Sequence, residues 1–294
     1  MNEATIGSCA LQALKSYYRK WVKQEEGVRA DQDPEALHQM RVGLRRLRSG
    51  LLCFAPILPR SIRRQEPKLG QISRILGRVR DLDVLRQALT NNYMPLLPEV
   101  EQVQLQKYLA QRERQRQKYF HRMIALLDSP FYRRTRKTIG SWLKDPHMQE
   151  AGDFAVTEMM PQLLLPSLRA VLLPNWNLRK QKQLHDLRKL FKLTRYQLEC
   201  FTPYFGEELN PSLRHLATAQ EVLGSLHDRL VLLETFSQKQ WRRLPHLYQI
   251  IQQHQGEDWR TWYSLNYNLQ WLQVLLQIRS LCTAKESIPS SQEN

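Results

Sequence analysis

Hydrophobic residues recur at spacings of three and four along most of the chain, with polar residues between them, which is the pattern of amphipathic helices. Runs rich in Val, Ile and Thr are few, as are two-residue turns that contain glycine. The pattern therefore predicts an all-α chain. About ten helices are expected, over residues 3–26, 34–54, 60–90, 98–127, 131–144, 150–173, 177–202, 212–236, 239–254 and 258–283.

Several helix starts are marked by a capping residue followed by proline. The cap accepts a hydrogen bond from an otherwise unpaired amide, and proline tolerates the first helical position. These dipeptides are Asp33-Pro34, Ser129-Pro130 and Asn210-Pro211. The polar residues 284–294 are expected to form a disordered tail.

The chain contains an internal repeat. The segment LHQMRVGLRRLRSGLLCFAP, which starts at Leu37, resembles LHDLRKLFKLTRYQLECFTP, which starts 147 residues later at Leu184. The same offset aligns ILGRVRDLDVL with VLGSLHDRLVL, and two matches in one register indicate duplication. We therefore expect one domain over residues 3–283, made of repeat halves 3–147 and 148–283 that pack as a pseudo-twofold pair of antiparallel helical bundles.

The chain is strongly basic, and the excess charge lies mainly in its first half. The 294 residues include 44 Lys and Arg against 28 Asp and Glu, a net charge of +16, which attracts polyanions. Residues 1–147 hold 28 basic and 14 acidic side chains, whereas residues 148–294 hold 16 and 14. A ligand is therefore expected to be anionic, with the first half carrying the greater share of the binding.

One helix of each repeat half combines an apolar face with a cationic face. At 100° per residue the cations fall within an arc of about 80°, roughly opposite the leucines. We call these cationic faces the stripes; they consist of His38, Arg41, Arg45 and Arg48 in the first half and of His185, Arg188, Lys192 and Arg195 in the second. Neither stripe contains a carboxylate, although like charges one turn apart repel each other.

A row of cations at one-turn spacing fits a linear polyanion with closely spaced phosphates. Arginine can hold phosphate oxygens bidentately, and lysine acts as a point charge. Histidine adds a donor and gains charge if a bound phosphate raises its pKa. The alternative is that the stripes are solvated or pair with acids elsewhere; Asp81 and Asp228 are interpreted as structural partners that orient them.

The motifs HQMRVGLRRLR with LGRVRDLDVL, and HDLRKLFKLTRYQLE with LGSLHD, resemble the CHAD family, the conserved histidine α-helical domain. The resemblance covers nearly the whole chain. It implies two four-helix-type bundles about a pseudo-twofold axis, a basic central channel at their junction, and binding of inorganic polyphosphate. Carried over by position, the resemblance points to the two stripes as ligands, His38, Arg41, Arg45 and Arg48 with His185, Arg188, Lys192 and Arg195, and to Arg46 as a second cation. Arg74 and Arg78, one turn apart on the helix that leads to Asp81, and Lys189 complete the predicted ligand set.

The two halves depart from strict equivalence at two cationic positions. Arg46 corresponds to Leu193, and Arg80 corresponds to His227. Both departures remove charge from the second half, which again indicates unequal sharing of the ligand.

Three functions follow from these observations. Non-catalytic polyphosphate binding is the first, and nucleic-acid binding is the alternative because the sequence pI is ≈ 9.9. Nucleic-acid binding usually involves aromatic side chains that stack on bases, and both stripes are purely cationic. A hydrolase of polyphosphate or phosphate esters is the third, but no GxxxxGK[ST], HExxH or alternating ExExK strand is present. No cofactor and no metal are predicted.

The sequence does not decide the role of two further basic runs. RERQRQKYFHR, from Arg112, and FYRRTRK, from Phe131, either extend the binding groove or form solvated helix faces. The oligomeric state is left open as well.

Cysteine usage and hydropathy indicate the compartment. The four cysteines form no CxxC pair and are expected to be reduced core thiols: Cys9, Cys53, Cys200 and Cys282. No stretch of about 18 apolar residues lacks charge or proline, and no leader is evident. A cytoplasmic protein is expected, with polyphosphate granules as a candidate location.

Overall fold

The computed structural model of the chain describes residues 4–172, 176–265 and 267–286. In these residues helices account for nearly all regular structure, and the extended pairing is confined to one antiparallel bridge between Thr5 and Ala155. The predicted all-α class is confirmed. None of the described helices combines the length and the hydropathy needed to cross a bilayer.

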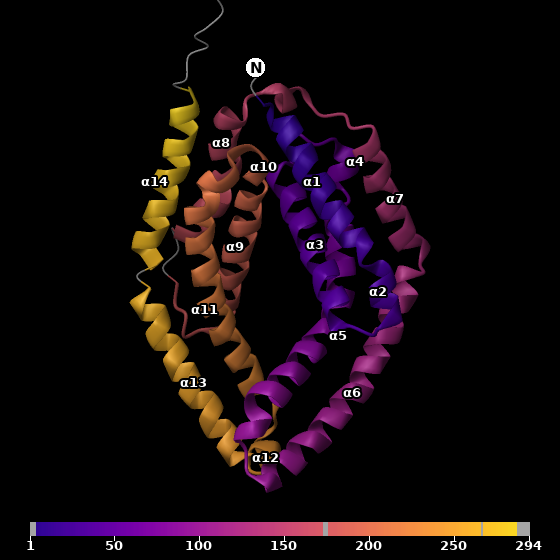
Figure 1. Cartoon of the computed structure of the whole chain (residues 1–294), viewed down its shortest axis with the longest axis vertical. Helices are drawn as coiled ribbons and strands as arrows, with labels where there is room; N and C mark the ends of the chain where they lie inside the picture. Colours follow the sequence, from indigo (N-terminus) through magenta and orange to yellow (C-terminus); the bar gives the residue numbers. More distant parts are fainter. Residues whose placement is uncertain (1–3, 173–175, 266, 287–294) are drawn as a thin grey trace, which may run out of the picture.

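The first part of the chain forms a bundle of long helices joined by short ones (Figure 1). The long helices are α1 (Ile6–Lys23), α3 (Pro34–Cys53), α5 (Glu66–Ala88), α6 (Glu99–Leu127) and α7 (Pro130–Lys144). The short elements are α2 (Glu25–Ala30), α4 (Arg60–Arg63), the π-helical turn η1 (Leu89–Tyr93) and the 3₁₀ turn η2 (Met94–Leu96).

The second part begins after the 3₁₀ turn η3 (Glu150–Asp153) and forms another set of helices beside the first. Its long helices are α8 (Val156–Leu172), α9 (Gln181–Glu199), α11 (Asn210–Thr235), α13 (Pro245–Ser264) and α14 (Tyr267–Glu286). The short elements are α10 (Thr202–Phe205), η4 (Gly206–Leu209) and α12 (Gln238–Trp241).

Corresponding helices of the two parts pack in the same order. In the first part α1 packs on α3, α3 on α5 and α5 on α6; in the second part α8 packs on α9, α9 on α11 and α11 on α13. Helix α3 also contacts α9, which begins 147 residues after it. Phe54 and Phe201, also 147 residues apart, meet with ring centroids 5.7 Å apart. Equivalent residues meet in this manner when two units are related by a twofold axis. The pseudo-twofold relation between the two parts stays a prediction.

The apolar faces of these helices share one core. Its buried residues come from both parts of the chain, including Trp21, Leu44, Leu187 and Phe201. A second, smaller core around Tyr93 and Phe236 closes the far end, where α5 and α6 meet α11 and α13. The stripes are therefore carried on helices whose other faces are fixed by packing.

Local signals located some helix ends and missed others. Asp33 caps α3 by accepting from the amide of Glu35 at 2.8 Å, and Ser129 caps α7 by accepting from that of Tyr132 at 3.2 Å, as predicted. The predicted cap at Asn210 is wrong, because this residue already has helical dihedrals and continues from η4.

Other boundaries also differ from prediction. The predicted helix 60–90 is divided into α4 and α5, and the predicted helices 239–254 and 258–283 are replaced by α12, α13 and α14. Of the expected tail over 284–294, the first three residues belong to α14, and 287–294 lie outside the described residues.

Candidate functional site

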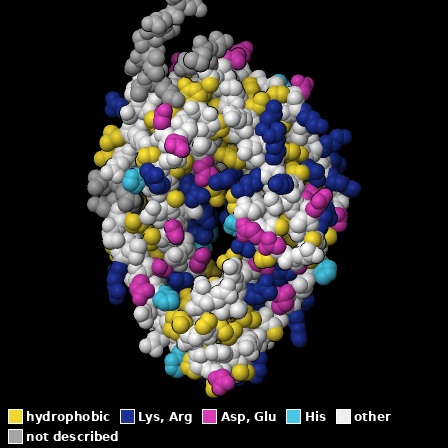
Figure 2. All heavy atoms as spheres, in the orientation of Figure 1, with side chains coloured by type: hydrophobic (Ala, Val, Ile, Leu, Met, Phe, Trp, Pro, Cys, Tyr) yellow, Lys and Arg dark blue, Asp and Glu magenta, His cyan; other side chains and the backbone are white. Residues whose placement is uncertain are grey.

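Helix α3 carries the first stripe on the side away from its core face. Met40, Leu44 and Leu47 are completely buried, whereas His38 and Arg45 stay partly exposed. Figure 2 shows Lys, Arg and His side chains gathered around a hollow at the centre of the molecule, together with several carboxylates. We call this hollow the central opening.

The two stripes approach each other at the α3–α9 contact. Arg45 of α3 lies close enough to Arg188 and Lys192 of α9 for its charge to lower the pKa of both. Arg45 and Lys192 are themselves 147 residues apart. The structure therefore joins the two halves of the sequence repeat into one cationic cluster.

Carboxylates neutralise the outer members of the stripes. Arg48 donates to Glu66 at 2.9 and 2.6 Å, and Arg195 lies 3.2 Å from Glu199. The expected acidic partners were Asp81 and Asp228; Glu66, at the start of α5, and Glu199, one turn further along α9, are additional ones.

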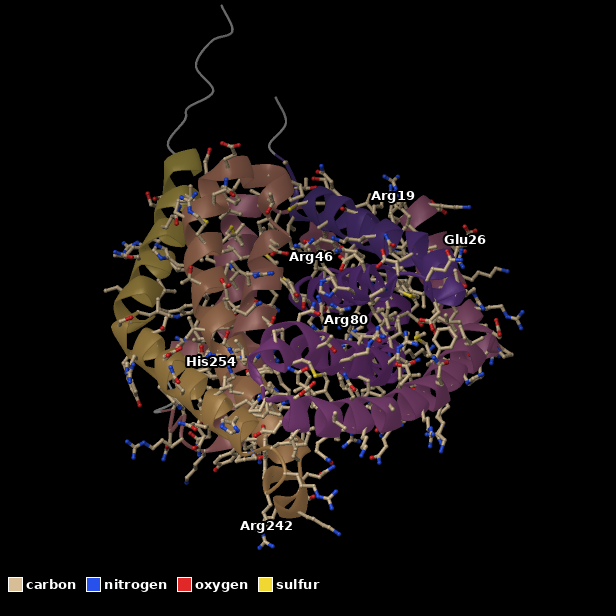
Figure 3. All side chains as sticks on the ribbon, turned by 60° about the horizontal axis from the view of Figure 1, so that its bottom comes forward. Arg19, Glu26, Arg46, Arg80, Arg242 and His254 are labelled. Carbon is tan, nitrogen blue, oxygen red and sulfur yellow. The ribbon has the colours of Figure 1, made fainter. Side chains whose placement is uncertain are left out.

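Arg46 is held by the same acidic group. Its Nε lies 2.8 Å from Glu199 of α9, and its guanidinium lies over the Tyr196 ring, 5.9 Å from the centroid. Figure 3 places Arg46 between the helices of the two parts. Arg46 therefore links α3 to α9, and it is less available for a ligand than its sequence position indicated.

As predicted, Asp81 and Asp228 each lie near an arginine of the stripes. Arg41 lies 3.8 Å from Asp81, and Arg188 lies 3.7 Å from Asp228. Both pairs are longer than a close hydrogen bond, and both carboxylates are largely exposed. Water competes for such carboxylates, so they neutralise the arginines only in part.

Arg41 is the most enclosed member of its stripe, at 7% exposure. Its Nη1 donates to the Ser73 carbonyl at 3.1 Å and would lie 2.6 Å from a Cβ at Gly77, so only glycine leaves room for it. Burial, followed by the charge of Arg45, lowers the Arg41 pKa to about 10. Arg41 therefore supports the cluster more than it presents a free charge.

Arg45 and Lys192 stand apart from these pairs. Among the described residues, no carboxylate oxygen lies within ion-pair distance of either side chain. Burial, followed by the charges of Arg188 and Arg45, lowers the pKa of Lys192 to about 7. An anion placed between Arg45 and Lys192 would relieve this repulsion and raise that pKa again.

Histidines flank the cluster in both halves. Burial and then the charge of Arg80 lower the pKa of His38. In the second half the rings of His185 and His227 lie 4.8 Å apart, and burial followed by Arg188 lowers the His227 pKa to about 4. The Nδ1 atoms of both rings are buried without a hydrogen-bond partner. These imidazoles are neutral at neutral pH and offer hydrogen bonds to an anion.

Arg80 and His227 were left out of the predicted ligand set, yet they occupy corresponding places beside His38 and His185. Because they are 147 residues apart, the internal repeat could have added both residues to the predicted ligand set. Figure 3 shows Arg80 among the helices of the first part, near the middle of the molecule, where its Nη1 donates to the Pro34 carbonyl at 3.3 Å.

Three predicted ligands do not join Arg45 and Lys192, although Lys189 lies near the flanking histidines and, after burial, its charge lowers the pKa of His185. Lys189 is exposed and lies 3.7 Å from Asp186, one turn earlier in α9. Arg74 and Arg78 are exposed on α5, and the Arg78 guanidinium lies over the ring of Tyr119 of α6. The structure does not bring these three together with Arg45 and Lys192.

In the two basic runs whose role was left open, some side chains make tertiary contacts and others are exposed. Arg116 is buried between Asp31 and Asp83, and Arg112 donates to the Tyr108 hydroxyl at 2.6 Å. In the second run Arg136 pairs with Glu25 at 2.8 Å. These arginines are structural; the exposed members of the runs are Arg114, Lys118, Arg122, Arg133, Arg134 and Lys137.

The remaining chemistry of the described residues is limited. They contain no group of three or more His, Cys, Asp or Glu side chains placed to hold a metal ion. All four cysteines are buried, as predicted for core residues, and their reduced state stays a prediction. The arrangement as described is suited to holding an anion between two helices.

Comparisons with known proteins agree with this fold. A family profile described as the CHAD domain matches residues 12–237. The crystal structure of the CHAD domain from the plant Ricinus communis superposes with a TM-score of 0.64 at 24% identity, covering 95% of this chain and 93% of that one. PptA from Streptomyces chartreusis superposes with a TM-score of 0.67 at 14% identity, covering 89% and 99%. No curated protein matches the sequence.

Proposed function

Because the chain belongs to the CHAD domain family, as the match over residues 12–237 shows, we propose that it binds inorganic polyphosphate between the two stripes. Arg45, Arg188 and Lys192 would contact the phosphates, and the flanking histidines would donate hydrogen bonds. The proposed role is binding without catalysis, since these groups neutralise phosphate charge. A cytoplasmic location at polyphosphate granules is part of this proposal.

The observation that supports the proposal most is the close approach of two cations, Arg45 and Lys192. Two cations from different halves approach each other without a carboxylate in reach, and the pKa of Lys192 falls to about 7 as a result of burial and of its cationic neighbours. Such repulsion lowers the stability of the free protein and is relieved when an anion binds. This arrangement supports a binding site, because folding alone would favour opposite charges here.

Nucleic acid is the second candidate, and the stripes disfavour it. Helix α3 contains no aromatic residue, and Phe191 and Tyr196 of α9 are buried. Bases would therefore find no exposed Phe, Trp or Tyr ring on these two helices on which to stack. A bare phosphate chain needs no such ring.

The proposal predicts that removing both unpaired cations weakens binding. Arg45→Met with Lys192→Met should reduce affinity for long-chain polyphosphate at least about tenfold, since a hydrogen bond to a charged group contributes about 1.5–3 kcal/mol. Isothermal titration calorimetry at fixed ionic strength measures the change. The charge-matched control is Lys239→Met with Arg242→Met, at the end of the molecule where Arg242 points outward (Figure 3). Equal losses in the two variants would show only a general effect of net charge.

The lowered pKa of Lys192 predicts a pH dependence of binding. In the free protein this amine is charged below about pH 7 and neutral above it. Bound phosphate favours the charged form, so binding above that pH must take up a proton. Affinity should therefore fall as pH rises from about 7 to about 9, by up to about tenfold per unit for one coupled proton.

The variant Lys192→Arg distinguishes proton uptake by Lys192 from proton uptake by other groups. Arginine keeps its charge throughout the range, so the variant should bind with a flatter pH profile above about pH 7. The groups that act on Lys192 are Arg188, Arg45, Asp228 and Arg195. A profile in Lys192→Arg as steep as that of the native protein would assign the proton uptake to another group.

A further inference from the structure

A second row of cations lies on α5 and α6, outside the cluster at the α3–α9 contact. We call it the outer track, and it consists of Arg74, Arg78, Arg114, Lys118 and Arg122, all exposed. The guanidinium groups of Arg78 and Arg122 both lie over the ring of Tyr119, 5.6 and 5.9 Å from its centroid. This shared ring places the cations of the two helices side by side.

No ion pair or hydrogen bond among the described residues accounts for these charges. Within the described residues, none of the five side chains takes part in an ion pair or a side-chain hydrogen bond. Their neighbours Arg112 and Arg116 do make such contacts. On α6, Arg114, Lys118 and Arg122 follow one another at one-turn spacing, where like charges repel. A row of exposed, unpaired and repelling cations is suited to an anionic ligand.

The outer track begins one residue away from the face of α5 that meets the first stripe. The face of α5 that meets the first stripe includes Ser73, which accepts from Arg41, and Asp81, which pairs with it. Arg74 follows Ser73 directly, so its side chain is turned by about 100° from that face. A chain that leaves the stripe across α5 therefore meets Arg74 and Arg78 first and α6 next.

We propose that the outer track binds the part of a long polyphosphate that extends beyond the central opening, so that affinity rises with chain length. This inference rests on the proposed function. Once the stripes hold one stretch of the chain, contact with the track is intramolecular and is favoured by a high effective concentration.

The track favours polyphosphate over nucleic acid for a specific reason. Tyr119 is the aromatic residue among these cations, and two guanidinium groups already lie over its ring. A base could stack on this ring only by displacing them. The track thus offers charge along a line, which is what a flexible phosphate chain requires.

The test compares short and long ligands on one variant. Arg74→Ala, Arg78→Ala and Arg122→Ala together should weaken long-chain polyphosphate binding about tenfold at low salt and reduce the slope of log K against log salt by about 2, at about 0.7 per contact. Binding of tripolyphosphate, which is too short to reach both surfaces, should change less than about twofold. The charge-matched control is Lys239→Ala with Arg242→Ala and Arg243→Ala.

The outcomes distinguish this inference from the function on which it rests. If the native chain binds neither ligand, the proposed function itself fails. If the native chain binds both, but the outer-track variant binds long chains as tightly as the control variant does, the track is not a binding surface. If duplex DNA displaced long-chain polyphosphate more readily from the native chain than from the outer-track variant, the track would instead be a nucleic-acid-binding surface. Circular dichroism and melting temperature confirm that all variants are folded.

Discussion

Arg116→Met is expected to lower the free energy of unfolding by about 3–5 kcal/mol, the usual effect of removing one partner from a buried ion pair. The Arg116 side chain is 9% exposed and contacts two carboxylates. Its Nε donates to Asp83 at 2.5 Å, and its two Nη atoms donate to Asp31 at 2.8 and 2.5 Å. Without the guanidinium, Asp83 stays buried with an uncompensated charge. Urea denaturation followed by circular dichroism measures the loss.

Two further variants test this explanation. Arg114→Met, on the exposed side of the same helix, should change stability by less than about 0.5 kcal/mol. Asp83→Asn in the Arg116→Met background should restore part of the loss, because the buried group is then neutral. A loss below about 1 kcal/mol for Arg116→Met would contradict the assignment of Arg116 as structural.

Leu44→Ala and Arg45→Ala are expected to have opposite effects, although the residues are adjacent. Leu44 is completely buried, and its truncation should cost about 2–5 kcal/mol of stability. Arg45 has no carboxylate partner among the described residues and lies near Arg188 and Lys192. Its removal relieves repulsion, so the stability of the ligand-free protein should change by less than about 0.5 kcal/mol or rise.

The rise in melting temperature that polyphosphate causes should distinguish the two variants in the opposite sense. A ligand that binds only the folded state stabilises it by about 2.7 kcal/mol at a hundredfold excess over Kd, and the melting temperature rises accordingly. Arg45→Ala should lose much of this rise, whereas the folded fraction of Leu44→Ala should keep it. If Arg45→Ala destabilised the ligand-free protein as much as Leu44→Ala does, the stripe would be structural.

The sequence predicted the helices that carry the site better than those at the C-terminal end. The leucine period and the Asp33 cap defined α3 because local signals and core packing agree there. Helix α13 was misplaced, although Pro245 at its start is a local signal for a helix N-terminus. Gly256, in the gap between the two predicted helices, lies inside α13. A glycine is tolerated there because the helix is held by packing on α11.

The sequence also predicted which faces carry the cations, but not which cations remain unpaired. Glu66 reaches Arg48 only because α4 and the turn after it place the start of α5 beside α3, and sequence spacing does not encode this. Glu199, by contrast, lies four residues after Arg195 in the same helix and was a visible partner. The contact of Arg46 with α9 depends on tertiary packing and had no local signal.

The uneven charge of the two halves has a different origin from the one expected. Each stripe contains one histidine and three cations, so the stripes themselves are balanced. Much of the surplus of the first half lies on exposed positions of α4, α5, α6 and α7. The expectation that the first half binds more strongly stays a prediction, and the proposed outer track would account for it.

Competition at constant ionic strength tests the central claim most directly. Labelled long-chain polyphosphate bound to the native protein would be displaced by unlabelled polyphosphate, by duplex DNA and by single-stranded RNA at matched phosphate concentrations. We predict that unlabelled polyphosphate displaces the label and that either nucleic acid needs at least about tenfold more phosphate to do so, since neither can stack bases on the stripes. Displacement by duplex DNA at equal phosphate concentration would contradict the assignment of polyphosphate as the ligand.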